Sequence, residues 1–570
     1  MSKLTVTNSA SLLTLDNRAN AATLLDMAKK QLDTRADDTA LIFVPADGTP
    51  HRQISTRDFF AGAARYAAML RQIGIADRDL VILVMEHSEA LLHAFWGALM
   101  VGAIPSIFPF LSEKLDPSLY FERVQALITH SGAKAVIAST PFVAGLRELL
   151  GSISVIDESG LEVAKAEIAF SQSCAGSDIA FLQHSSGSTG LQKGVALSHE
   201  AVLNQLANYR EALNLQPSDV IVSWLPLYHD MGLIAGFVMP IAQGIPLVLM
   251  SPFHWVRDPK LLLQLIQQYD GTLCWLPNFA YNFTAARVRD SQIEGLRLDS
   301  MRLFINCSEP TRAESHRQFA HRFEKYGVKP ESLVTCYAMA ENTFAVTQSQ
   351  PQPNVDLISR AALSERHQAI PAQDGELNIE MLSNGKPIPN CRVKIVDEMR
   401  QELPARHVGE IAVQSDSMLT GYYRRDDLTA QALIDGWYLT GDYGYLVDGE
   451  LYITGRKKDL IIVGGKNVYP QDLETLASAV PGVHAGRVVA FGVDDDRLGT
   501  ESIVMVVEAD NQDEDIRSEI GKRVRAMIAQ QTDVTLGAVH VVDRGWLHKT
   551  SSGKIARSAN REKYLSEISQ

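Results

Sequence analysis

The chain has 570 residues, of which 46% are hydrophobic, 21% charged and 7% aromatic. This balance is typical of a soluble globular protein and excludes disordered and collagen-like chains. The formal net charge is −14 at pH 7. A general nucleic-acid binder is disfavoured, because the phosphates of the nucleic acid would carry the same sign.

The five cysteines are widely spaced and form no CxxC pair, so the sequence predicts neither a disulfide framework nor a zinc site. The N-terminal residues contain no apolar segment long enough for a signal peptide. Two uncharged stretches, residues 90–112 and 231–256, exceed the length of a membrane helix, but proline and glycine interrupt both. We therefore expect a cytoplasmic protein with no membrane span.

From residue 56 onwards, helix-like amphipathic stretches alternate with short apolar runs. The alternation predicts an α/β fold with parallel strands, and the continuous apolar character of the runs predicts strands buried on both faces. The predicted strands occupy residues 79–85, 134–139, 178–183, 220–226, 246–250, 271–277 and 301–306.

The pattern changes near residue 370 to short segments separated by Gly, Asn and Asp, which predict an antiparallel β region. After about residue 465 the pattern is that of a small α+β unit. We predict a large N-terminal domain of several layers, residues 1–457, and a smaller C-terminal domain, residues 458–570.

The first chemical motif, QHSSGSTGLQKGV at residues 183–195, directly follows a predicted strand. Small and hydroxylic residues let backbone N–H groups and hydroxyls surround phosphate oxygens, and a lysine adds positive charge. It is not a Walker loop, because Gln192 occupies the position of the second glycine. The candidate phosphate-binding residues are Ser185, Ser186, Gly187, Ser188, Thr189, Gly190 and Lys193.

Five further motifs follow in order: WLPLYHDMGL at 224–233, YAMAENT at 337–343, YLTGDYG at 438–444, GRKKDLI at 455–461 and KTSSGKI at 549–555. With the first motif, this series resembles the adenylate-forming superfamily of acyl-CoA synthetases, acyl-AMP ligases and nonribosomal-peptide adenylation domains. The resemblance covers essentially the whole chain. It implies that the N-terminal domain binds ATP and an acyl substrate, and that the C-terminal domain is mobile.

The resemblance assigns the central catalytic role to Lys554, which would contact both the substrate carboxylate and the α-phosphate. Physical chemistry agrees, because two anions must be brought together and need positive charge at the point of reaction. Glu341 would bind Mg²⁺, a hard cation that prefers carboxylates and phosphate oxygens, with help from Thr189.

For the nucleotide, the resemblance implies that Asp442 accepts hydrogen bonds from the ribose, Arg456 binds ribose or phosphate, and Tyr337 lies near the adenine. Further nucleotide-binding positions are Ser308, Glu309, Pro310, Ala338, Met339 and Ala340. We expect the positive charge to be local, at Lys193, Arg456, Lys458 and the segment around Lys554.

The same resemblance places His229 at the junction of the acyl pocket and the nucleotide. We assign it substrate positioning, because a carboxylic acid is already ionised at pH 7 and needs no general base. Trp224, Met231 and Phe279 are candidates for the acyl pocket, although a core position fits each equally well. Lys458 matches the family's hinge, about which the small domain would rotate between the two half-reactions.

Between Thr343 and Gly385 the chain has a longer connection than acyl-CoA synthetases have, and fatty acyl-AMP ligases carry an insertion there. That branch transfers a fatty acyl group to the phosphopantetheine thiol of an acyl carrier protein. Other features, such as DDDRLGTESIVMVVE at residues 494–508, resemble CoA ligases, so the acceptor stays open between carrier protein and CoA. Two further alternatives are a catalytically silent homologue acting as a binding module and a luciferase-like oxidising enzyme.

Overall fold

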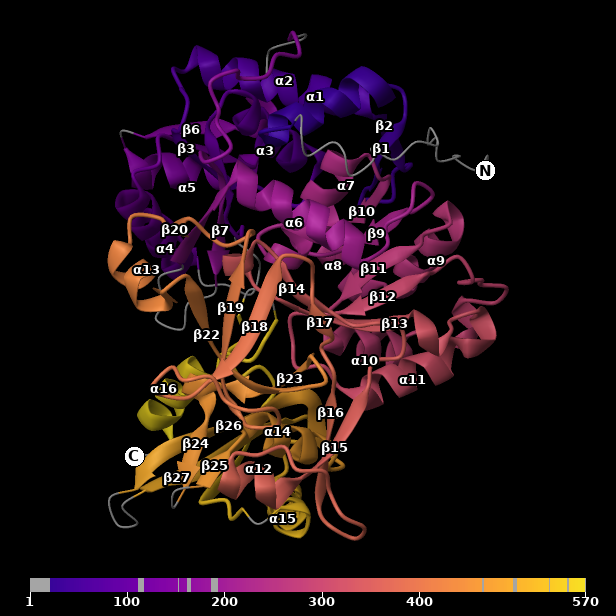
Figure 1. Cartoon of the computed structure of the whole chain (residues 1–570), viewed down its shortest axis with the longest axis vertical. Helices are drawn as coiled ribbons and strands as arrows, with labels where there is room; N and C mark the ends of the chain where they lie inside the picture. Colours follow the sequence, from indigo (N-terminus) through magenta and orange to yellow (C-terminus); the bar gives the residue numbers. More distant parts are fainter. Residues whose placement is uncertain are drawn as a thin grey trace.

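The computed structural model describes residues 21–110, 117–151, 153–160, 166–185, 193–463, 466–495, 500–532, 534–550 and 553–568. Figure 1 shows a large N-terminal part above a smaller C-terminal part that contains α14 to α16 and β24 to β28. No helix of these ranges is both long enough and apolar enough to cross a bilayer.

The larger of two central sheets has nine strands, whose inner members are parallel. Both edges are antiparallel, which the alternating sequence pattern did not predict. In spatial order the strands are β17 (Lys386–Pro387), β14 (Ala345–Gln348), β13 (Leu333–Ala338), β12 (Leu303–Asn306), β11 (Leu273–Leu276), β9 (Ile221–Ser223), β10 (Leu247–Met250), β1 (Thr39–Val44) and β2 (Arg52–Ser55).

The second sheet has seven strands and the same character, with a parallel body and an antiparallel edge at the β7 side. Its strands are β20 (Gly421–Tyr422), β8 (Lys193–Ser198), β7 (Ile179–Ser185), β4 (Ile104–Ile107), β3 (Leu80–Val84), β5 (Ala135–Ala138) and β6 (Ser154–Asp157). Strands β3 and β5 are buried along their whole length, which confirms the prediction of two-sided burial.

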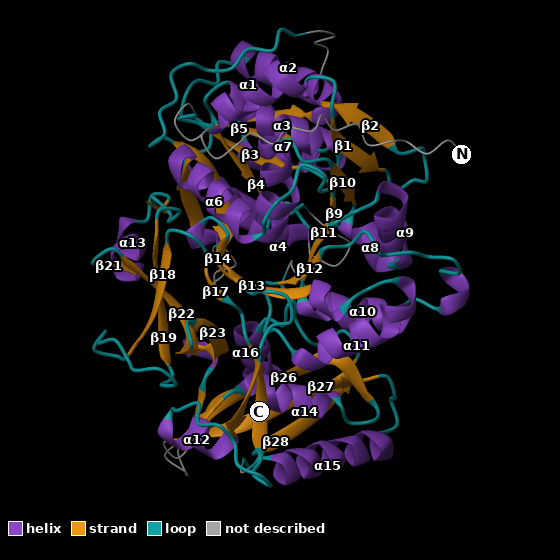
Figure 2. Ribbon diagram, turned by 45° about the vertical axis from the view of Figure 1, so that its right-hand side comes forward, coloured by secondary structure: helices purple, strands orange, loops and turns teal. Residues whose placement is uncertain are grey.

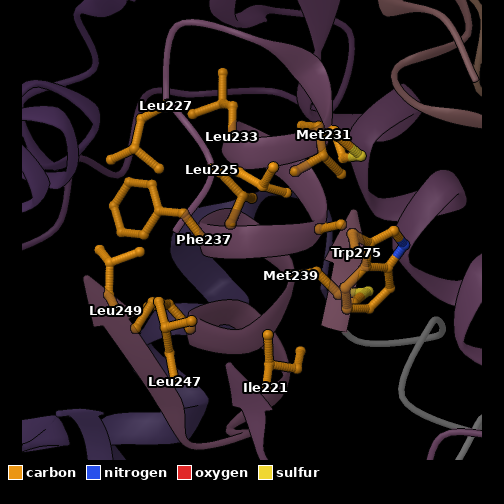
Figure 3. Packing of buried hydrophobic residues seen from close by; sticks show 14 of the residues in the cluster. Ile221, Leu225, Leu227, Met231, Leu233, Phe237, Met239, Leu247, Leu249 and Trp275 are labelled. Atoms are coloured by element: carbon orange, nitrogen blue, oxygen red, sulfur yellow. The ribbon is translucent and has the colours of Figure 1, made fainter. Parts of the chain in front are cut away.

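Helices cover these sheets and enclose a large hydrophobic cluster, and a second, smaller cluster lies against the seven-stranded sheet. Figure 3 shows part of the larger cluster, where the Phe237 ring lies between Leu227 and the strand residue Leu249. The helices of the N-terminal part are α1 (Leu24–Arg35), α2 (Thr56–Gln72), α3 (Glu89–Met100), α4 (Pro117–Ser131), α5 (Thr140–Leu150), α6 (His199–Ala212), the π-helix η3 (Met231–Val238), α7 (Met239–Gln243), α8 (Pro252–Arg257), α9 (Lys260–Tyr269), α10 (Asn278–Arg287) and α11 (Ala313–Phe323).

The predicted antiparallel region forms a five-stranded sheet, preceded by a separate hairpin. The sheet contains β18 (Cys391–Val396), β19 (Gly409–Ser415), β21 (Leu433–Ile434), β22 (Trp437–Val447) and β23 (Glu450–Arg456), with α13 (Asp426–Ala432) beside it. The hairpin, β15 (Val355–Ser359) and β16 (Asn378–Leu382), encloses α12 (Arg360–Arg366) and lies within the long connection noted in the sequence.

The C-terminal part has hydrophobic clusters of its own on the two faces of a three-stranded sheet. The strands are β26 (Val483–Asp495), β27 (Thr500–Ala509) and β28 (Ala538–Asp543), and the hairpin β24 (Ile461–Val463) and β25 (Lys466–Val468) precedes them. Its helices are α14 (Pro470–Ser478), α15 (Glu514–Gln531) and α16 (Arg557–Glu567). Figure 2 shows α14 and α15 beside the sheet, below α10 and α11.

Candidate functional site

Most of the predicted site residues gather where the parallel strands of the nine-stranded sheet end. Ser308, Glu309 and Pro310 follow β12, and Tyr337 and Ala338 are the last residues of β13. Met339 and Ala340 lead into the short helix η7 (Ala340–Asn342), which contains Glu341. The carboxyl ends of parallel strands are where α/β proteins bind their ligands.

Asp442, on β22 of the five-stranded sheet, contacts the nine-stranded sheet at this edge. The Tyr337 phenol donates to its Oδ2 at 2.7 Å, and the Arg456 Nε lies 3.5 Å from its Oδ1. Asp442 and Arg456 are direct cross-strand partners on β22 and β23, so the sheet register itself sets this pair. Burial, and then the negative charge of Asp442, hold the pKa of Tyr337 well above its usual value. The carboxylate can still accept hydrogen bonds from a ligand's hydroxyls.

The carboxylate of Glu341 lies in a cluster of phenols. Tyr422 donates a hydrogen bond to it at 2.9 Å, and the Tyr438 hydroxyl lies 3.0 Å from that of Tyr422. Burial raises the pKa of Glu341, and the charge of Asp230 adds to the rise. Negative charge that is costly to bury alone favours a bound cation.

This donor set fits a magnesium ion that is shared with phosphates. Groups of three or more acidic, His or Cys side chains that could enclose a metal are absent from the described part of the chain. Mg²⁺ usually binds through one or two carboxylates and completes its shell with phosphate oxygens and water. Glu341 therefore suits a metal that arrives with a nucleotide.

Lys193 is the first residue of β8, and its ammonium lies 4.8 Å from the centre of the Tyr422 ring. Ser185 ends β7, and only its backbone is described. The predictions for Ser186, Gly187, Ser188, Thr189 and Gly190 lie outside the described residues.

Lys458 lies in the short helix η8 (Lys457–Asp459), at the start of the predicted small domain. Partial burial lowers its pKa, and the positive charges of Arg456 and Lys193 lower it further. These basic side chains therefore gather beside Asp442, as expected for a site that receives an anion.

The structure brings Lys554 of the small domain to the loop that contains His229 and Asp230. Burial lowers the pKa of His229 to about 3, and the nearby Lys554 charge contributes to that shift. The same charge opposes the rise that burial causes in the pKa of Asp230. A turn fixes the position of the lysine, because Thr550 and Lys554 exchange hydrogen bonds of 2.7 and 3.2 Å.

The three predicted acyl-pocket residues lie around an aromatic cluster. The indoles of Trp224 and Trp255 stack at 3.7 Å, and Phe279 packs edge-on against both, at 6.3 and 5.9 Å. The Met231 sulfur lies 3.8 Å from the Ser308 hydroxyl, which connects the cluster to the nucleotide residues. The cluster continues the same edge of the sheet, because β11 is the neighbour of β12, and β9 and β10 follow β11 in the sheet.

Several residues of this site were missed in the sequence. Tyr422 lies between the motifs, and Trp255 lies in a segment after β10 to which no role was assigned. Tyr438 and Asp230 belong to motifs, but a tyrosine or an aspartate at these positions does not by itself indicate a role in the site. Neighbouring positions of β9 and β10 in the sheet, which sequence spacing does not fix, bring Trp255 to Trp224.

Comparison with known proteins gives consistent results. The AMP-binding enzyme family matches residues 28–423. The chain is 31% identical to a long-chain-fatty-acid–AMP ligase, FadD26, of Mycobacterium marinum, over 95% of this chain and 97% of that one. It is 30% identical to a medium-chain-fatty-acid–[acyl-carrier-protein] ligase, JamA, of Moorena producens, over 88% of each chain.

A solved structure has the same fold. It comes from structural and functional studies of fatty acyl-adenylate ligases from E. coli and L. pneumophila and is 28% identical in sequence. The TM-score is 0.88, and the match covers 97% of this chain and 98% of that one. The predicted α/β architecture, with parallel sheets and an additional β region, is thereby confirmed.

Proposed function

The chain belongs to the AMP-binding enzyme family, and from this we infer that it uses ATP to activate a fatty acid, or another carboxylic acid. The carboxylate oxygen would attack the α-phosphorus, forming an acyl-adenylate and releasing pyrophosphate. The observation that best supports this is the position of Lys554, whose charge acts on His229 and Asp230 at the edge where Glu341 and Asp442 also lie.

In the adenylation step the chain must hold two anions in line and stabilise the charge that develops between them. Lys554 would contact the substrate carboxylate and the α-phosphate, and Lys193 and Arg456 would add positive charge along the phosphates. Glu341, assisted by Thr189, would hold Mg²⁺, which when bound supplies positive charge to the departing pyrophosphate.

The remaining nucleotide contacts follow the sheet edge. Asp442 would accept hydrogen bonds from the ribose hydroxyls, and Tyr337, whose phenol already engages Asp442, would lie beside the adenine. The segments at Ser308–Pro310 and Ala338–Ala340 would line the base and ribose. The loop from Ser185 to Gly190 would surround the phosphates.

The acyl chain would extend from His229 toward the aromatic cluster of Trp224, Trp255 and Phe279, with Met231 at the junction. Apolar and aromatic side chains are the usual lining of a pocket for such a chain. Phe237, on the same π-helix as Met231, belongs to the core, because it is fully buried against Phe95.

For the second step we propose the phosphopantetheine thiol of an acyl carrier protein as the acceptor. The thiol sulfur would attack the acyl carbon, AMP would leave, and the thiol proton would be released. The carrier-protein ligase among the relatives supports this choice. The inserted hairpin, which lies against the small domain, supports it as well, because fatty acyl-AMP ligases carry an insertion at this place. CoA is the second candidate, because the segment at residues 494–508 resembles CoA ligases.

The adenylation proposal is tested by carboxylate-dependent exchange of pyrophosphate into ATP. Lys554→Ala should reduce exchange by about 100-fold or more, because the charge that stabilises the transition state is removed. Lys522→Ala, which removes an exposed lysine of α15, is the matched control and should leave exchange unchanged. Absence of exchange in the wild type across a broad panel of acids would support a silent binding module instead.

The acceptor is tested by mass spectrometry of the products formed from ATP and a medium-chain fatty acid. One reaction contains CoA and the other a holo carrier protein. We expect acylated carrier protein and little acyl-CoA, whereas efficient formation of acyl-CoA would overturn the carrier-protein proposal.

A further inference from the structure

Tyr422 lies where three sheets of the N-terminal part meet. It is the last residue of β20, the edge strand of the seven-stranded sheet, and it pairs there with Val195 of β8. Its hydroxyl contacts Glu341, which follows the nine-stranded sheet, and Tyr438 on the five-stranded sheet. A single side chain thus connects elements that otherwise belong to separate layers.

The polar end of Tyr422 forms a directed chain of hydrogen bonds. The phenol O–H donates to the Glu341 carboxylate at 2.9 Å. Because a hydroxyl has one proton, the Tyr438 hydroxyl at 3.0 Å can donate to the Tyr422 oxygen while the Tyr422 proton is bound to Glu341. Both phenols are buried, and consecutive hydrogen bonds of this kind strengthen one another in a low-dielectric environment.

The ring of Tyr422 has a different partner. The Lys193 ammonium lies 4.8 Å from the ring centre, a distance typical of cation–π attraction. Lys193 begins the strand that pairs with β20, so the backbone ladder and the side-chain contact join the same two strands. One residue therefore orients a carboxylate through its hydroxyl and an ammonium through its ring.

We propose that Tyr422 is a positioning residue for the magnesium–ATP complex. Its phenol binds one oxygen of Glu341 and leaves the other oriented for the metal, while its ring holds Lys193 until a phosphate attracts the lysine. Groups that orient a metal ligand in this way are usually worth a factor of 10 to 100 in metal affinity. The proposal rests on the proposed role of Glu341 and goes beyond it by naming what positions that carboxylate.

The two halves of the proposal can be separated by substitution. Tyr422→Phe keeps the ring and removes the hydroxyl, whereas Tyr422→Leu removes both. Tyr438→Phe removes only the second phenol of the chain. The matched control is Tyr445→Phe. Tyr445 is a fully buried tyrosine on β22, the strand that also contains Tyr438, and its hydroxyl donates to Asp356 rather than to the Glu341 cluster.

The measurement is binding of ATP to the full chain by calorimetry, with Mg²⁺ and with EDTA, together with Mn²⁺ binding in the presence of ATP by electron paramagnetic resonance. For Tyr422→Phe we expect metal affinity to fall by about 10- to 100-fold, with metal-free ATP binding unchanged. Tyr438→Phe should give a smaller loss of the same kind. Only Tyr422→Leu should also weaken metal-free ATP binding, because it removes the aromatic ring that orients Lys193.

The proposal is overturned if Tyr422→Phe leaves metal affinity at the wild-type value, or if Tyr445→Phe lowers it equally. Thermal unfolding identifies any variant that does not fold, in which case Tyr438→Phe still provides the test. These readouts need no turnover. If the wild type shows no exchange with any acid, the proposed function fails, yet the binding measurements still decide the role of Tyr422.

Discussion

His229 shows at the level of one residue how the site separates positioning from proton transfer. Its ring is partly buried, and its buried Nε2 has no hydrogen-bond partner among the residues with described positions. Burial, followed by the adjacent Lys554 charge, lowers its pKa to about 3. An imidazole in this environment is neutral throughout the physiological range and has no proton to donate as an imidazolium.

We therefore expect His229→Asn to raise the KM for the carboxylic acid without changing the shape of the pH profile of adenylation. A lowered pKa means that the charged form appears only as the pH falls toward 3, so between pH 6 and 9 His229 contributes no titration. The check is kcat/KM against pH for both proteins. If the pH profile of the wild type has a limb with an apparent pKa between 6 and 7 and the profile of the variant lacks it, His229 acts as a general base.

At the scale of elements, an ion cluster joins the proposed hinge to the segment that contains Lys554. Arg557 begins α16, three residues after Lys554, and pairs with Asp459 of η8 at 2.5 Å and with Glu474 of α14 at 2.7 Å. Its Nε donates to the carbonyl of Ala490 at 2.9 Å. Because Asp459 directly follows Lys458, the proposed hinge and the segment that contains Lys554 have a common anchor.

We predict that Arg557→Met destabilises the small domain by about 3 kcal/mol or more, because two partly buried carboxylates lose their partner. Pyrophosphate exchange should fall with it, since the Lys554 segment loses its anchor. Hydrogen exchange of peptides from the small domain measures the first effect. Arg523→Met removes an exposed pair with Glu519 and should cost less than about 1 kcal/mol; an equal effect would refute the anchor.

The sequence predicted the helices and strands well, but it did not predict which side chains of distant elements come into contact. Apolar runs located β9, β10 and β11 and their burial, because burial of a parallel strand leaves a continuous signal. The two-residue strand β20 gives no periodic signal, so the place of Tyr422 beside Glu341 could not be predicted. Asp459 lies in a recognised motif and Arg557 two residues after another, yet their pairing across 98 positions depends on the packed domain.

At the scale of the whole molecule, the charge of −14 contrasts with the local charge of the site. Lys193, Arg456 and Lys458 lie close enough together to affect one another, and Lys554 of the small domain acts on His229 and Asp230. Basic groups gathered in this way attract an anionic substrate despite the acidic surface. This arrangement exists only while the small domain stays in its present orientation.

Contacts across the two parts maintain that orientation. A cavity of about 210 Å³ lies between the inserted hairpin and the small domain and is lined by residues of both, including Leu363, Ile379, Val468 and Leu473. The interface is thus incompletely packed, which lowers the cost of separation. On another side, the Arg312 guanidinium contacts Asp472 of α14 at 3.5 Å and the carbonyl of Gln471 at 3.4 Å.

Arg312→Ala should therefore slow adenylation and favour transfer. Loss of a partly exposed ion pair costs up to about 1 kcal/mol, or roughly fivefold in the population of the present orientation. Pyrophosphate exchange should fall by about that factor, while transfer of a preformed acyl-adenylate to carrier protein should not.

The charge-reversed pair, Arg312→Asp with Asp472→Arg, should recover part of the exchange activity. If both half-reactions fall equally, or if the reversed pair recovers nothing, Arg312 does not hold the two parts together, because only an interaction between the parts can be restored by reversing both charges.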